Sequence, residues 1–375
     1  MNTSNKVLGF GGVRQSNLEL YRIVCMLLIV AHHCMVNSGL TGVDAATGIP
    51  TGPLTNSPTG INSLVLWTLG MWGKTGINCF LLITGYFMCT STITIRKFVK
   101  LLAWIYTYKI IIFIIFFATG YETFSVIRVI QIIMPVWSFI NADFVSCFIG
   151  FWLTIPFWNI LIKNMSRRQH ELLLLLLLGM YTILGSIPKF HVTFNYVTWF
   201  GVIYLVSSYI RLYPHPLFHN KRLWMYMTFV SVILAMCSMI LMSHLFGAKN
   251  PTFFVSDSNK IMAVAVAVTS FLWFKNMDLK YHKLINTVGA STFGVLLIHA
   301  NSEAMRQWLW KDTVDCIGHY SLPTFQMIMY FCGCVLLIFT ICTVIDIIRI
   351  KTIEKPFFKW YDRKYNNKNQ ICQNH

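Results

Sequence analysis

Long apolar runs separated by short polar and basic loops dominate this chain. Ten runs approach or reach the roughly 20 residues that cross the hydrocarbon core of a bilayer as a helix. They lie at residues 18–38, 64–88, 98–118, 144–163, 171–187, 197–212, 223–246, 260–275, 284–300 and 323–349. The pattern predicts an all-α polytopic membrane protein with about ten transmembrane helices.

The stretch before the fourth run, residues 125–143, is apolar but irregular and contains Pro135 and Trp137. We expect a re-entrant or interfacial segment there. Composition agrees with a membrane protein, because 56% of the 375 residues are hydrophobic and only 11% are charged. Soluble domains average about 25% charged residues.

Basic residues are distributed unevenly between the two sides of this ten-span arrangement. One side carries 22 Lys and Arg residues, the other carries six, and Lys74 and Lys109 fall within spans. This bias predicts that both termini are cytoplasmic. Because the net charge of +17 lies in short loops, we expect no nucleic-acid partner.

The whole chain, residues 1–375, is predicted to be one integral membrane domain that ends in a basic cytoplasmic tail at 350–375. Basic and aromatic positions alternate in this tail, which is typical of an interfacial anchor against anionic lipid. The first run contains Arg22 and two histidines, so we interpret it as a retained span rather than a signal peptide.

Arg22 and His33 form the most informative pair in the sequence. They lie eleven residues apart in the first run, which places both on one helix face about 16 Å apart along the axis. Ionisable groups within a membrane are costly and indicate function by default. A neutral histidine can act as a base or a nucleophile; the competing interpretation is a structural histidine with an arginine that reaches the interface. His32 points about 100° away, which favours a structural role.

A second basic group, Arg96, Lys97 and Lys100, begins the third run on the predicted cytoplasmic side. Lys97 and Lys100 are neighbours on a helix, and such a group can bind the phosphates of a cytosolic donor. Ordinary positive-inside charge would account for the same residues.

Several polar residues are predicted at or near the outer side, where they are candidates for substrate binding. Lys74 can direct a substrate oxygen or simply reach the interface. Trp137 and Asp143, with Asn141, combine an aromatic face with hydrogen-bonding groups, as sugar sites do, although an interfacial aromatic belt explains them equally. His299 and Glu303 are four residues apart and would share a helix face.

Eleven cysteines are scattered along the chain, and most lie within apolar runs. Their spacing matches no metal-binding pattern and no disulfide framework, so we expect neither. Most of these cysteines are therefore interpreted as small buried hydrophobic residues.

The element Arg22 to His33 resembles the first span of the acyltransferase type 3 family, which comprises integral membrane enzymes that acylate cell-surface sugars. Four later stretches resemble that family in order and spacing: the second span ending at Thr84-Gly85-Tyr86, the basic group from Arg96 to Lys100, the segment from Trp152 to Ile162, and the element from Ser291 to His299. The family commonly has two arginines in the basic group and a tyrosine where Leu296 stands here.

The resemblance implies transfer of an acyl group, with acetyl-CoA as donor, to a hydroxyl of a cell-surface polysaccharide or lipid-linked glycan. It implies that Arg22, Arg96, Lys97 and Lys100 bind the donor and that His33 acts as base or acyl carrier. The protein would be a multi-pass protein of the plasma or inner membrane, with no metal. The alternative is a transporter or flippase that moves a lipid-linked sugar without chemistry, although no inverted repeat is present.

Overall fold

The computed structural model describes residues 14–43, 49, 51–134, 144–190, 192–193, 195–246 and 251–371. Within these ranges the chain is helical, with no β-strand beyond an isolated bridge at Val43. The α-helices are α1 (Ser16–Asn37), α2 (Pro53–Asn56), α3 (Ile61–Gly70), α4 (Gly73–Met88), α5 (Ile95–Ala118), α6 (Val126–Ile133), α7 (Phe144–Asn164), α8 (Arg167–Leu178), α9 (Tyr196–Leu212), α10 (Lys221–Phe246), α11 (Ile261–Lys275), α12 (Lys283–His299), α13 (Glu303–Arg306), α14 (Thr324–Arg349) and α15 (Lys355–Ile371).

Six helical stretches of the described chain are long and apolar enough to cross a membrane. These are Ser16–Asn37, Ile95–Ala118, Phe144–Asn164, Arg167–Ser186, Lys221–Leu245 and Thr324–Tyr365. The bent pair of α12 with Glu303–Thr313 raises the total to seven if it counts as one span. The all-α membrane fold is therefore confirmed, while ten spans and cytoplasmic termini stay predictions.

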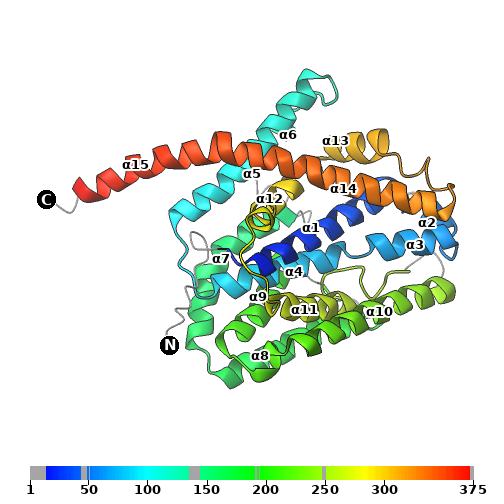
Figure 1. Ribbon diagram of the computed structural model, residues 1–375, viewed down its shortest axis with the longest axis horizontal. Coiled ribbons are helices and arrows are strands. Elements are labelled where there is room, and N and C mark those ends of the chain that lie inside the picture. Colours follow the sequence, from blue (N-terminus) through cyan, green and yellow to red (C-terminus); the bar gives the residue numbers. More distant parts are fainter. Residues whose placement is uncertain are drawn as a thin grey trace.

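Helix α1 lies in the interior and packs against α3, α4, α11, α12 and α14. Figure 1 shows α14 and α15 along one edge of the molecule and α10 along the opposite edge, with α1 between them. Two apolar cores flank α1. Met26 and Ile29 belong to the core shared with α12 and α14, whereas Leu18 and Tyr21 belong to the core shared with α4, α9 and α11. The predicted catalytic helix is thus held on several sides.

Polar side chains also join the helices within this interior. The Tyr21 hydroxyl lies 2.8 Å from the Ser270 hydroxyl, which connects α1 to α11. The indole nitrogen of Trp199 donates to the Asn78 side chain at 2.9 Å, which connects α9 to α4. Such bonds stabilise helix pairs in lipid, where apolar contact alone gives little preference for association.

The structure divides the apolar run at 64–88 between α3 and α4, with a break at residues 71–72. At the break, a side-chain carbon added to Gly73 would lie 2.3 Å from the His32 ring, so only glycine permits this approach of α4 to α1. His32 Nδ1 donates to the Gly70 carbonyl at 2.8 Å. This bond satisfies an acceptor that the break removes from the helix, as interrupted helices within a membrane require.

The segment predicted to be re-entrant or interfacial is described only in its first part. Helix α6 there is short, and Ile132 is its one buried residue. Arg128 on this helix pairs with Glu122 at 2.6 Å, just before the helix begins. Residues 135–143 lie outside the described residues.

Candidate active site

His33 on α1 and His299 at the end of α12 form a direct pair. Nδ1 of His33 lies 2.9 Å from Nε2 of His299. His299 is completely buried, and its ring packs edge-on against Trp310, with 6.0 Å between ring centroids. The two histidines are 266 residues apart in sequence and meet because α1 packs along α12.

The hydrogen-bond partners of the two rings determine where their protons lie. His299 Nδ1 is 2.6 Å from the carbonyl oxygen of Val295, and a carbonyl only accepts. His299 Nδ1 therefore carries the proton, and Nε2 of the neutral ring is an acceptor. His33 Nδ1 consequently donates to His299, which leaves His33 Nε2 unprotonated. This is the nitrogen that a general base or a nucleophile uses.

A small cavity of about 130 Å³ borders His33. Its walls are mostly apolar and aromatic, and four side chains with polar atoms reach it. These polar side chains are His32, His33, Lys74 and Thr84. We call this space the histidine cavity. An apolar wall keeps the dielectric constant low, which strengthens any polar interaction made inside it.

Lys74, at the start of α4, lines the histidine cavity as well. Its ammonium group donates to the Tyr196 hydroxyl and lies 3.7 Å from a carboxylate oxygen of Asp257. An ammonium group has three N–H donors, so these two partners leave one donor for an oxygen of a bound molecule. The structure therefore places Lys74 and His33 on the same cavity, while its role in binding substrate stays a prediction.

Of the other predicted substrate-binding residues, His299 and Glu303 do not line the histidine cavity. The shared face of His299 and Glu303 does not form, because α12 ends at His299 and the chain turns by 96° into α13. The Glu303 side chain is 86% exposed and pairs with Arg306. Trp137 and Asp143 lie outside the described residues.

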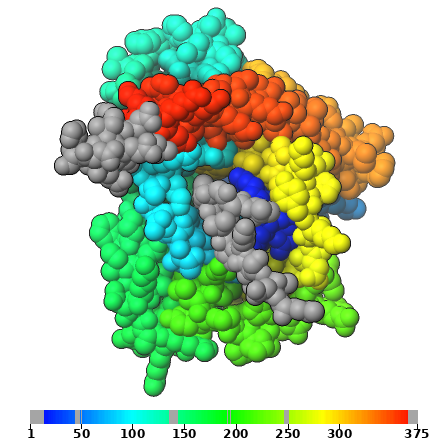
Figure 2. All heavy atoms as spheres, turned by 60° about the vertical axis from the view of Figure 1, so that its left-hand side comes forward, coloured from blue at the N-terminus to red at the C-terminus, as the bar shows by residue number. Residues whose placement is uncertain are grey.

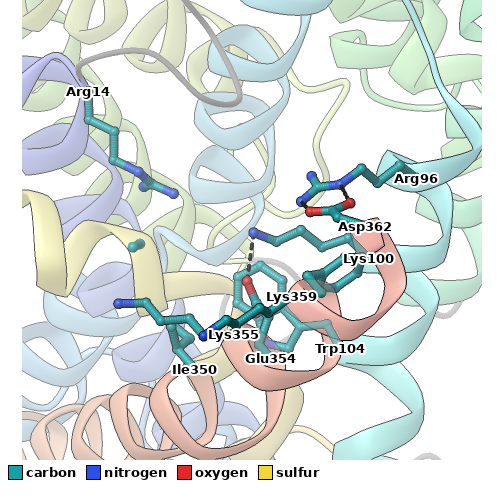
Figure 3. Close-up of a pocket in the computed structure, with 11 residues that line it drawn as sticks. Arg14, Arg96, Lys100, Trp104, Ile350, Glu354, Lys355, Lys359 and Asp362 are labelled. Carbon is teal, nitrogen blue, oxygen red and sulfur yellow. Dashed lines mark hydrogen bonds and ion pairs between the residues drawn. The ribbon is translucent and has the colours of Figure 1, made fainter. Parts of the chain in front are cut away.

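A second cavity of about 430 Å³ lies between the start of α5 and the C-terminal segment. Figure 3 shows charged side chains from both elements around this space. We call it the basic cavity, because five cationic residues line it against two carboxylates. The charged lining residues are Arg14, Arg96, Lys100, Glu354, Lys355, Lys359 and Asp362.

The three predicted donor-binding residues of α5 divide between two faces of the helix. Arg96 and Lys100 are one turn apart and line the basic cavity. Lys97 does not line it; its ammonium group donates to the Ser91 hydroxyl at 2.7 Å and to the Thr92 carbonyl at 2.6 Å. The helical period separates Lys97 from Arg96 by about 100°.

Both cavity-lining cations of α5 form ion pairs with residues that follow α14. Arg96 makes two parallel hydrogen bonds to the Asp362 carboxylate, at 2.7 and 2.8 Å. Lys100 lies 2.6 Å from Glu354, which also accepts from Arg349 at 2.9 Å. These pairs hold α5 against the C-terminal segment and give the basic cavity two defined walls.

Arg22 occupies α1 between the two cavities. Its Nη1 lies 3.6 Å from Glu19, and Glu19 pairs at 2.9 Å with Arg14 of the basic cavity. The Nε of Arg22 is buried and has no hydrogen-bond partner among the described residues. Buried donors are normally satisfied, so this N–H is open to a hydrogen bond with a bound molecule. Helix α1 continues unbroken from Arg22 to His33.

Helix α12 lines both cavities with one face. Ala290 reaches the basic cavity, and Phe293 and Leu296, each three residues further on, reach the histidine cavity. The rings of Phe293 and Trp104 meet edge to face, with 5.2 Å between centroids. Because Trp104 lines the basic cavity and Phe293 lines the histidine cavity, this ring contact links the walls of the two spaces.

Sequence reasoning missed the part that the C-terminal segment plays in the basic cavity. The sequence predicts a lipid anchor for the tail that contains Lys355 and Lys359, yet both residues line this cavity. Their spacing of four residues places them on one helix face and was a usable signal. The Val295 carbonyl that orients His299 carries no sequence signal, because every residue has one.

No group of three or more metal-binding side chains occurs in the part of the chain that the structure describes. No curated protein and no protein of solved structure gives a significant match to this chain. The family described as an acyltransferase domain matches residues 15–347, which include α1, α5, α12 and almost all of α14. This chain therefore belongs to the acyltransferase type 3 family and is a membrane acyltransferase by membership.

Proposed function

We propose that this protein transfers an acetyl group from acetyl-CoA to a hydroxyl of a cell-surface polysaccharide or lipid-linked glycan. One observation carries the proposal: His33, whose Nε2 is left unprotonated, lines a cavity whose Phe293 wall contacts Trp104 of the basic cavity. The family supplies the class of reaction. The cationic side chains of the basic cavity suit the phosphates of an anionic donor. His33 in the histidine cavity suits the reaction at the thioester of that donor.

The donor would bind with its phosphates in the basic cavity, where Arg96 and Lys100 lie. The charge bias assigns this end of α5 to the cytosol, where acyl-CoA is available. Movement of the Trp104 and Phe293 rings would let the pantetheine arm enter the histidine cavity. The buried Nε of Arg22 would donate to the donor along the way.

At His33 the chemistry is a general-base acyl transfer. Nε2 takes the proton of the acceptor hydroxyl while its oxygen forms a bond to the thioester carbonyl carbon. The bond from carbon to sulfur then breaks, the thiolate leaves with that proton, and the products are an ester and CoA. His299 holds the His33 ring through Nδ1 and keeps Nε2 available. The proposal is direct transfer to the acceptor, with no acyl group carried on His33.

Lys74 would bind an oxygen at the outer end of the histidine cavity, through the N–H that Tyr196 and Asp257 leave available. An acceptor that arrives at this depth would come from the outer side of the membrane or from a lipid-linked glycan. The protein would accordingly act as a multi-pass enzyme of the plasma or inner membrane.

Mass analysis of cell-surface glycan from cells with and without this protein tests the proposal. We expect a population heavier by one acetyl group per modified sugar, present only with the wild-type protein. Cells that express His33→Ala at the same level serve as the control and should lack that population. Identical glycan masses in all three samples would contradict the proposal.

A further inference from the structure

We propose that α15, which follows the family-matched residues, forms one wall of the donor site and binds donor phosphates through Lys355 and Lys359. The inference rests on the proposed acyl-CoA donor and extends it to a part of the chain that the family does not cover. Six of the eleven residues that line the basic cavity lie beyond residue 347.

The contact between α15 and α5 is specific rather than a loose surface association. The Arg96 guanidinium bonds to Asp362 through two hydrogen bonds and lies 5.0 Å from the centroid of the Phe358 ring. Phe358 is only 7% exposed. Figure 2 shows the helix lying across α5 on the molecular surface. These contacts place α15 beside the start of α5, along the basic cavity.

The cationic residues of the basic cavity that have no acidic partner among the described residues include two from α15. Arg96 and Lys100 are compensated by Asp362 and Glu354. Lys355 and Lys359 line the same space, and neither has an acidic partner among the described residues. Like charges one helical turn apart repel each other, and a phosphate between them would remove that repulsion.

Ligand chemistry also favours a polyphosphate over a neutral sugar. Five cations and two carboxylates give the cavity lining a net charge of +3, which matches a donor with several phosphate groups. The Arg96 contact shows the two-pronged geometry that a guanidinium makes with carboxylate and phosphate alike. Because Arg96 and Asp362 are both partly exposed, their pair is weak enough for a phosphate to compete with the carboxylate.

The opposite face of α15 explains the aromatic residues that suggested a lipid anchor. Trp360 is 54% exposed, and the Lys364 ammonium lies over its ring, 5.1 Å from the centroid. Neither residue lines the basic cavity. One face of the helix thus serves the donor site, and the other is available to the surroundings.

Calorimetric titration of CoA into the full chain in nanodiscs of zwitterionic lipid tests the proposal. The double variant Lys355→Ala/Lys359→Ala should weaken CoA binding about tenfold, through the loss of two charge contacts. The matched control Lys351→Ala/Lys364→Ala removes the same charge from positions outside the cavity and should change binding less than about twofold. Asp362→Asn frees Arg96 and should strengthen binding.

Equal CoA affinity of the two double variants would overturn the proposal. So would an effect of Lys355→Ala/Lys359→Ala that appears only in nanodiscs of anionic lipid, because the lysines would then act on the membrane. Failure of the proposed function looks different: wild type would transfer no acetyl group, whatever the two double variants do to CoA binding. Wild type that binds no CoA would overturn both.

Discussion

The histidine cavity and the basic cavity share α12 but have opposite designs. The histidine cavity is small, mostly apolar and lined by His33, whose Nε2 is left as an acceptor by the bond from Nδ1 to His299. The basic cavity is about three times larger, at about 430 against 130 Å³, and several charges line it. Recognition of a charged donor tolerates a wide, hydrated site, whereas proton transfer needs one oriented nitrogen away from water.

The largest expected effect comes from the reacting nitrogen itself. His33→Ala should lower kcat about 10³-fold, because general-base catalysis typically contributes 10²–10⁴-fold. CoA affinity should stay within about twofold, since the basic cavity is unchanged. Initial rates of CoA release and calorimetric CoA binding measure the two effects. Loss of both together would show that the cavities are not functionally separate.

The next effect concerns the residue that orients His33. His299→Leu removes the acceptor for His33 Nδ1 and should lower kcat about 10²-fold, with donor KM little changed. His299→Gln offers a side-chain oxygen as acceptor and should recover part of that loss. Steady-state kinetics and a pH–rate profile of both variants measure this. Equal activity of the Leu and Gln variants would mean that His299 only fills space.

Arg22 lies between the cavities, so its removal should affect the donor more than the acceptor. Arg22→Ala should lower kcat/KM for acetyl-CoA about tenfold through loss of a charge-assisted hydrogen bond. The acceptor KM should change by less than about twofold, and separate titrations of the two substrates measure both. Equal loss for the two substrates would contradict the placement of Arg22 on the donor route.

Two lysines of α5, one helical turn apart, differ in position: Lys100 lines the basic cavity, and Lys97 does not. Lys100→Ala should raise the donor KM roughly fivefold with kcat retained, because it removes a cation from the basic cavity. Lys97→Ala is the matched control and should change the donor KM little, since Lys97 bonds to Ser91 and Thr92 outside the cavity. The reverse ranking would contradict the geometry of this helix.

The smallest effect on catalysis is expected at His32. His32→Ala leaves the Gly70 carbonyl at the helix break without its donor, which should cost about 1–3 kcal/mol of stability. Thermal unfolding in detergent measures this loss. The kcat of His32→Ala should fall far less than that of His33→Ala, because Nδ1 of His32 donates to a backbone carbonyl. Stronger loss of kcat in His32→Ala would reverse the roles assigned to the two rings.

Sequence reasoning identified the membrane fold and the position of Arg22 and His33, because apolar run length and the helical period are local properties. It also placed Arg96, Lys100 and Lys74 where the structure finds cavities. The break between α3 and α4 was missed, since it depends on the approach of His32 to Gly73 from a different helix.

The division of the basic group and the pairing of His299 depend likewise on tertiary contacts. Lys97 differs from Lys100 only in which side of α5 faces the C-terminal segment. His299 was expected beside Glu303, but the end of α12 directs it to His33 instead. Side-chain partners across distant helices are set by packing, which one sequence does not reveal.

Single-turnover release of CoA measures whether His33 performs the acyl transfer. Wild-type protein loaded with labelled acetyl-CoA is mixed with the acceptor glycan, and free CoA and labelled ester are followed over time. We expect equal amounts of both products from wild type, and neither product from a His33→Ala protein that still binds CoA. Release of CoA and ester by His33→Ala at the wild-type rate would contradict it.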